Sequence, residues 1–162
     1  MSNIVSKQEV MKEIYNYFKE DKSMCLLVGD MGFAVLDDFF NNHSDRVFNT
    51  GINEQATMSM AAGMYLAGMK PLYYSQVPFL VMRAYEQIRY DINEHNMNVK
   101  LIGVGADNYF SMLGRSHCID NDDIAMMTIF KNFLILSPTT KTLKEEIHLM
   151  FQTNGPVYLR CR

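Results

Sequence analysis

The sequence predicts an α/β fold, a three-layer sandwich in which helices cover both faces of a mostly parallel β-sheet. Short apolar runs of strand length alternate with longer amphipathic segments along the chain. The run 24–28 is apolar at every position, as expected for a strand buried on both faces. No internal repeat or low-complexity linker interrupts this alternation, and 162 residues suit one domain. We therefore expect residues 1–162 to form a single domain.

The elements follow from this pattern in order. Val10, Ile14 and Phe18 recur at helical spacing and predict an opening helix before the strand 24–28. The same alternation then predicts strand 46–49, helix 54–68, strand 71–75, helix 79–94, strand 99–104, helix 122–130, strand 133–136, helix 139–152 and strand 156–160.

Composition excludes several classes of function. A formal charge of -3 without a basic stripe argues against a nucleic-acid partner. No stretch approaches the roughly 20 apolar residues of a membrane span, and residues 1–20 are too polar for a secretory signal. Cys25, Cys118 and Cys161 lack metal-ligand spacing, so we expect reduced thiols, with Cys25 in a core strand. The expectation is a cytoplasmic protein.

Familiar cofactor and metal motifs are incomplete. Gly103 and Gly105 follow a strand, but Asn108 stands where a dinucleotide fingerprint needs its third glycine. The sequence has no P-loop. Asp120, Asp122 and Asp123 resemble the start of a calcium loop whose later positions do not fit, so a helix N-cap cluster is the better interpretation.

Ligands of parallel sheets bind where strands end and helices begin, which directs attention to Asp30 and to segments 51–55, 76–79 and 105–117. Glu54 lies in the first turn of a helix, where it either complements the helix dipole at a solvated end or sits partly desolvated at a contact. Phe79 suits core packing as well as a ligand. His117 suits a surface position as well as a ligand.

Three separated segments in this order resemble the pyrimidine-binding domain of transketolases. They are 46–55 (RVFNTGINEQ), 79–89 (FLVMRAYEQIR), and 114–117 (GRSH) with 123–125 (DIA). The ending 155–160 (GPVYLR) resembles the last strand of that domain. The resemblance covers about residues 24–162 and implies a thiamine diphosphate enzyme whose aminopyrimidine ring rests on this domain.

The resemblance also implies roles for individual residues. Glu54 matches the glutamate that hydrogen-bonds N1′ of the ring, and Phe79 matches an aromatic residue that packs against the ring. Asp30 and Met31 fall where the family contacts the thiazolium region. His117 matches a histidine that contacts the sugar substrate, so Glu54 and His117 are the expected catalytic residues.

Two departures from the family pattern concern the ring and the substrate. Gln76 stands where many relatives have another aromatic residue facing the pyrimidine. The loop 105–113 replaces a glycine-rich stretch, and its Tyr109 and Phe110 are expected to alter the acceptor site.

The family's domain for Mg²⁺ and diphosphate has no counterpart in this sequence. The resemblance therefore implies a partner, the diphosphate-binding subunit that corresponds to the transketolase N-terminal section, in an α2β2 heterotetramer. Small residues at 61–63 are expected to contact a second chain. The implied reaction transfers a two-carbon ketol unit from a ketose or ketose phosphate to an aldose. The alternatives are decarboxylating carboligation of a 2-keto acid, as in deoxyxylulose phosphate synthases, and a non-catalytic association subunit.

Overall fold

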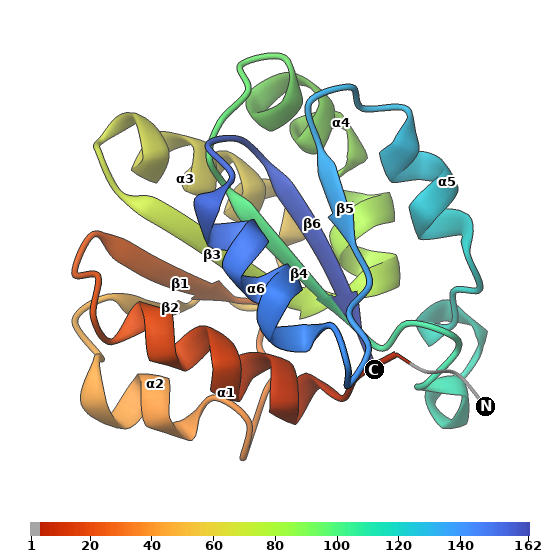
Figure 1. Cartoon of the computed structure of the whole chain (residues 1–162). Coiled ribbons are helices and arrows are strands. Elements are labelled where there is room, and N and C mark those ends of the chain that lie inside the picture. Colours follow the sequence, from red (N-terminus) through yellow and green to blue (C-terminus); the bar gives the residue numbers. More distant parts are fainter. Residues whose placement is uncertain (1–3) are drawn as a thin grey trace.

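The computed structural model describes residues 4–162 and contains a six-stranded sheet whose strands are all parallel (Figure 1). The strand order is β2-β1-β3-β4-β6-β5. The predicted α/β class with a mostly parallel sheet is confirmed. The strands are β1 (Met24–Val28), β2 (Val47–Asn49), β3 (Lys70–Gln76), β4 (Lys100–Val104), β5 (Leu134–Leu136) and β6 (Val157–Cys161).

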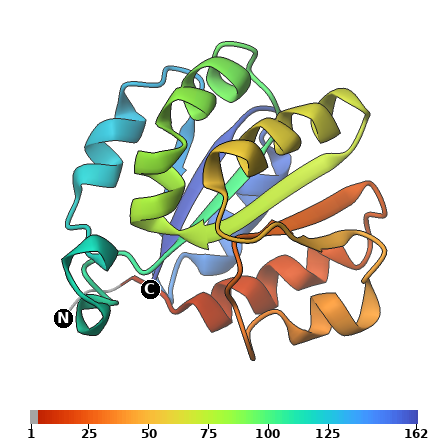
Figure 2. The ribbon, with the colours of Figure 1, turned by 180° about the vertical axis from the view of Figure 1, so that it is seen from behind.

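Helices cover both faces of this sheet, as Figures 1 and 2 show from opposite sides. One apolar core joins Ile14 of the first helix to Leu26 and Ile102 of the sheet. The other joins Met58 of the third helix to Leu27 and Leu101. The helices α1 (Lys7–Phe18), α2 (Asp37–Asn42) and α6 (Leu143–Gln152) cover the first face, and α3 (Glu54–Leu66), α4 (Tyr85–Gln87) and α5 (Asp122–Thr128) cover the second.

The segment 79–94 was expected to be one helix and is helical in a different way. Residues Phe79–Arg83 and Ile88–Asn93 form π-helical turns on either side of α4. Leu80, Ala84 and Ile88 are buried at four-residue spacing. Residues four apart lie near the same face in both helix types, so the apolar pattern could not distinguish them.

Two other helices differ from expectation. The six-residue helix α2 was not predicted, since so short a segment shows little periodicity. Helix α6 begins at Leu143 instead of 139, because Thr139 forms a bridge with Ile4 and its backbone N–H donates to Thr142 Oγ1 at 3.0 Å.

Helix α3 packs its small residues inward. Ala61 and Ala62 are buried in the core against the sheet, so the expectation that they contact a second chain is wrong. Gly63 is exposed, and no atom lies within 4 Å of the place that a Cβ would take.

The three cysteines are free thiols, and Cys25 lies buried in β1 as expected. Within residues 4–162, no helix has the length and apolar character needed to cross a membrane.

Lys100 is a buried charge on β4, and it leads to a prediction about pH. Its Nζ donates to the carbonyl oxygens of Thr153 and Gly155, each at 2.8 Å, and burial lowers its pKa from 10.5 to about 7. Between these pKa values the unfolded chain binds more protons than the folded one, so this group makes the free energy of unfolding rise with pH. We expect Lys100→Met to remove this rise, which is at most about 1.4 kcal/mol per pH unit for one proton.

Urea unfolding of both proteins at pH 7 and pH 9 measures the difference in slope. Lys131→Met removes an exposed lysine and should keep the wild-type slope. Equal slopes for Lys100→Met and wild type would contradict the prediction.

Candidate active site

A cavity of about 400 Å³ opens at the carboxyl ends of β1 and β3. The chain leaves β1 toward β2 on one side and returns to β3 on the other, so the connections diverge here, as they do at ligand sites of open α/β sheets. All six side chains singled out from the sequence line this one cavity: Asp30, Met31, Glu54, Gln76, Phe79 and His117.

Glu54 is buried at the first turn of α3 and forms an ion pair there. Its side chain is 4% exposed, and Arg83 Nη1 donates to both carboxylate oxygens at 3.2 and 3.3 Å. The Arg83 guanidinium also stacks on the Phe79 ring, 3.9 Å from its centroid. Arg83 therefore compensates the buried charge and links it to the aromatic ring. Burial excludes the solvated-end interpretation of Glu54.

The Phe79 ring contacts the imidazole of His117 edge to face, with 5.0 Å between the ring centroids. His117 closes a short 3₁₀ turn that begins at Arg115, and its Nδ1 lies 3.0 Å from Ser116 Oγ. The helix that follows β3 and the loop that follows β4 thus bring an aromatic ring and an imidazole together, although 38 positions separate them in the sequence.

The loop after β1 supplies the opposite wall of the cavity. Asp30 has a φ of 50°, a left-handed conformation that non-glycine residues adopt rarely. Its carboxylate accepts a hydrogen bond from Asn49 Nδ2 at 2.9 Å. Gly32 has a φ of 94°, and a Cβ there would lie 2.6 Å from Leu36. This turn holds Asp30 and Met31 at the cavity.

Strand β3 brings two unsatisfied polar groups to the cavity. Tyr74 is fully buried and Gln76 is 7% exposed. Neither Tyr74 Oη nor Gln76 Nε2 has a hydrogen-bond partner among residues 4–162. Burial raises the pKa of Tyr74 well above its ordinary value, so its hydroxyl remains a neutral donor. Unsatisfied buried donors are uncommon in native proteins, and at a cavity wall a ligand can satisfy them.

The rim of the cavity is apolar and uncovered. The side chains of Phe33, Ile52 and Leu113 are 88%, 71% and 57% exposed, and all three line the cavity. Exposed apolar residues gathered around a cavity are typical of a surface that another molecule covers.

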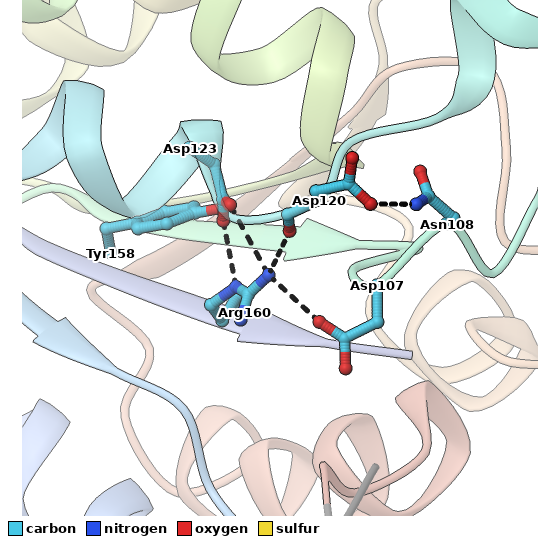
Figure 3. A network of polar contacts seen from close by, with 6 residues as sticks. All are labelled: Asp107, Asn108, Asp120, Asp123, Tyr158 and Arg160. Carbon is cyan, nitrogen blue, oxygen red and sulfur yellow. Dashed lines mark hydrogen bonds and ion pairs between the residues drawn. The ribbon is translucent and has the colours of Figure 1, made fainter. Parts of the chain in front are cut away.

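A buried polar network anchors the chain on either side of the loop that carries His117 (Figure 3). Arg160 on β6 donates to Asp123 through Nε at 2.8 Å and through Nη2 at 3.3 Å, and Tyr158 Oη donates to Asp123 at 2.6 Å. Arg160 also reaches Asp107 Oδ1 and the backbone oxygen of Asp120. The interpretation of the acidic cluster as helix caps is therefore wrong for Asp123, which is a buried ion-pair partner.

A larger cavity of about 830 Å³ lies at the amino ends of the strands, and Lys70 and Lys100 are among its lining residues. None of the six side chains singled out from the sequence borders it. No group of three or more His, Cys, Asp or Glu side chains within residues 4–162 could hold a metal ion.

Sequence reasoning missed three residues of the site. Arg83 was considered only as an interface or solvated residue, although its position four residues after Phe79 on a helix predicts contact between them. Tyr74 reads as an ordinary core residue in a strand. Lys7 lines the cavity from the start of α1, with its Nζ 4.5 Å from the Tyr109 ring centroid, and no local motif indicates that contact.

Comparison with known proteins gives a family. The model of the transketolase pyrimidine-binding domain matches residues 5–162. A subunit of the apulose-4-phosphate transketolase of Actinobacillus succinogenes is 32% identical over 163 residues, which cover 99% of this chain and 52% of that protein. The 1-deoxy-D-xylulose-5-phosphate synthase of Shouchella clausii is 33% identical over 147 residues, which cover 88% of this chain and 23% of that protein. The chain thus spans about half, or less, of the length of these relatives.

Solved structures show the same relationship. A split gene transketolase, described as an inactive beta4 tetramer, has a TM-score of 0.82 and 28% identity over 97% of this chain and 51% of that one. The transketolase of Campylobacter jejuni has a TM-score of 0.79 over 97% of this chain and 25% of that one, and its 14% identity supports the fold alone. The resemblance found in the motifs is confirmed: the chain belongs to the transketolase family, and residues 5–162 are its pyrimidine-binding domain.

Proposed function

We propose that this chain is the pyrimidine-binding subunit of a thiamine diphosphate-dependent, transketolase-like enzyme of two kinds of chain. One observation carries the proposal: the buried carboxylate of Glu54, the ring of Phe79 and the imidazole of His117 border a single cavity at the carboxyl edge of the sheet. When bound, thiamine diphosphate supplies a stabilised carbanion for breaking and forming bonds next to a carbonyl group. The proposed reaction transfers a two-carbon ketol unit from a ketose or ketose phosphate to an aldose.

The residues present fit the aminopyrimidine part of this cofactor. Phe79 offers a flat apolar face for a ring. Glu54 offers a carboxylate for a protonated ring nitrogen, and Arg83 holds that carboxylate in place. Tyr74 and Gln76 offer hydrogen-bonding groups that no described residue satisfies. In the proposed site, Glu54 holds the proton at N1′.

The other predicted residues are assigned to the reacting side of the cofactor. Asp30 and Met31, on the loop after β1, border the thiazolium ring in the proposed site. His117 has a polar ring edge at the same cavity and orients the sugar through a hydrogen bond. Phe110, from the loop 105–113 that departs from the family pattern, also lines the cavity and limits the size of the acceptor.

We assign Mg²⁺ and the diphosphate to a partner subunit, in a cytoplasmic α2β2 heterotetramer. The matched family segment is the pyrimidine-binding domain, and the chain spans about half of the related apulose-4-phosphate transketolase subunit. The exposed apolar rim formed by Phe33, Ile52 and Leu113 supports a covering chain. The neighbouring reading frame is the natural candidate, if it encodes a Gly-Asp-Gly segment with a downstream Asn.

Reconstitution tests this function. The chain and that partner are purified separately, and transfer from ketose and ketose phosphate donors is measured with thiamine diphosphate and Mg²⁺ for each chain alone and for the mixture. We expect turnover in the mixture only. If the partner alone is equally active, this chain is a non-catalytic association subunit and the proposal fails.

A second candidate is carboligation after decarboxylation of a 2-keto acid. The similarity to 1-deoxy-D-xylulose-5-phosphate synthases favours it, since one of them is 33% identical over most of this chain. Analysis of the products distinguishes the two reactions. Release of CO₂ from pyruvate with formation of a deoxyketose phosphate would replace ketol transfer as the assigned reaction.

A further inference from the structure

We propose that the side-chain amide of Gln76 recognises the amino edge of the pyrimidine ring. Its N–H donates to N3′, the ring nitrogen next to the exocyclic amine, and its carbonyl oxygen accepts from that amine. This inference rests on the proposed function, because thiamine diphosphate is the ligand that carries such a ring.

The first step of the argument is the unsatisfied state of the amide. Gln76 is the last residue of β3, is 93% buried and lines the cavity with Glu54 and Phe79. Its Nε2 has no hydrogen-bond partner within the described residues. A buried amide without partners is unfavourable, so a ligand acceptor at this place would be bound strongly.

The second step is the fixed position of the Gln76 stem. A Cβ built on Gly105 would lie 3.6 Å from Gln76 Cγ and 2.4 Å from Phe110, and Gly105 has a φ of 85° that disfavours other residues. The backbone of Gly105 and the Phe110 ring thus pack closely beside the methylene groups of Gln76. The amide is held at the cavity by its own stem.

The third step is the direction from which each polar group approaches. Tyr74 and Gln76 are two residues apart on one strand and therefore point to the same face of the sheet, the face on which Tyr74 contacts the core beneath α1. Glu54 comes from α3, on the opposite face. Gln76 and Glu54 therefore reach the cavity from different sides, which suits two different edges of one ring.

The fourth step is the match of donors and acceptors. An amide presents one donor and one acceptor side by side. An aminopyrimidine presents an acceptor nitrogen beside an N–H donor, the pattern that glutamine and asparagine bind in pairs on adenine. A carboxylate at N1′ leaves this edge free. An aromatic side chain in place of Gln76 would pack against the ring without making these bonds.

The experiment compares ligands that differ by one atom. Isothermal titration calorimetry of the reconstituted complex with Mg²⁺ measures the affinity of thiamine diphosphate and of two analogues, in which CH replaces N3′ or N1′. We expect wild type to bind the N3′ analogue about tenfold more weakly than thiamine diphosphate, the effect of one lost hydrogen bond with its donor left buried. Gln76→Met should bind thiamine diphosphate more weakly and no longer distinguish it from the N3′ analogue. The N1′ analogue should lose affinity in both proteins.

The controls separate the inference from the function on which it rests. Gln87→Met makes the same chemical change outside the cavity and should keep the wild-type preference. If Gln76→Met does not fold, Gln76→Glu keeps the volume, lacks the amide donor and should also lose the preference. Equal binding of thiamine diphosphate and the N3′ analogue by wild type, with weaker binding of the N1′ analogue, overturns the role of Gln76 and leaves the function intact. Failure of thiamine diphosphate to bind overturns both.

Discussion

Replacing Glu54 with Gln should lower turnover of the reconstituted enzyme by about 10²- to 10⁴-fold, the usual range for a lost proton-transfer group. Glutamine keeps the volume of the side chain and one oxygen for Arg83, but it lacks the negative charge that a protonated ring nitrogen needs. Arg83 is half exposed, so water can solvate its guanidinium when the charge of its partner is lost. The loss should therefore appear in catalysis and not in folding.

Exchange of the cofactor's C2 proton with deuterated solvent is the measurement closest to Glu54. We expect Glu54→Gln to slow this exchange while urea unfolding shows a largely retained fold. Glu145→Gln is the matched control, since Glu145 is an exposed acid in the first turn of α6 and its substitution removes only an interaction with the helix dipole. Wild-type exchange in Glu54→Gln would refute the role assigned to this carboxylate.

The positions of the candidate residues could be predicted from the sequence because each lies just beyond a strand. Parallel strands end at one edge of the sheet, so Asp30, Glu54 and Gln76 come together without any knowledge of pairing. The contacts between them depend on helix rotation and side-chain conformation, which a sequence pattern does not encode. Arg83 shows this limit: it was noticed, but its pairing with Glu54 requires two elements 29 residues apart to meet.

The strands were the most predictable part of the fold. The apolar run 24–28 coincides with β1, because burial on both faces leaves no polar position to confuse its ends. Helix 79–94 was placed correctly, but its π-helical turns were not foreseen, since they alter the backbone hydrogen bonds and leave the buried face unchanged. The ion pair of Asp123 with Arg160 was also missed, because 37 positions separate two residues whose local patterns suggest a helix start and a strand end.

Replacing Asp123 with Ala should lower the free energy of unfolding by about 3–5 kcal/mol, the cost of leaving one partner of a buried ion pair uncompensated. Asp123 is fully buried and Arg160 is 2% exposed, so water cannot solvate the guanidinium that remains. The loss would also remove the acceptor of the Tyr158 hydroxyl, whose pKa burial and the neighbouring carboxylate raise well above its ordinary value. The chain flanking the His117 loop would then be held less firmly.

Urea unfolding of Asp123→Ala and Asp122→Ala makes the comparison within one helical turn. Asp122 is exposed beside Asp123, so its substitution should change the free energy of unfolding by no more than about 0.5 kcal/mol. The double variant Asp123→Leu with Arg160→Met should recover much of the lost stability, because apolar residues of similar volume can replace a buried ion pair with little cost. If Asp123→Ala and Asp122→Ala cost the same, the network does not anchor this part of the fold. If the double variant is less stable than Asp123→Ala, the uncompensated charge of Arg160 is not the source of the loss.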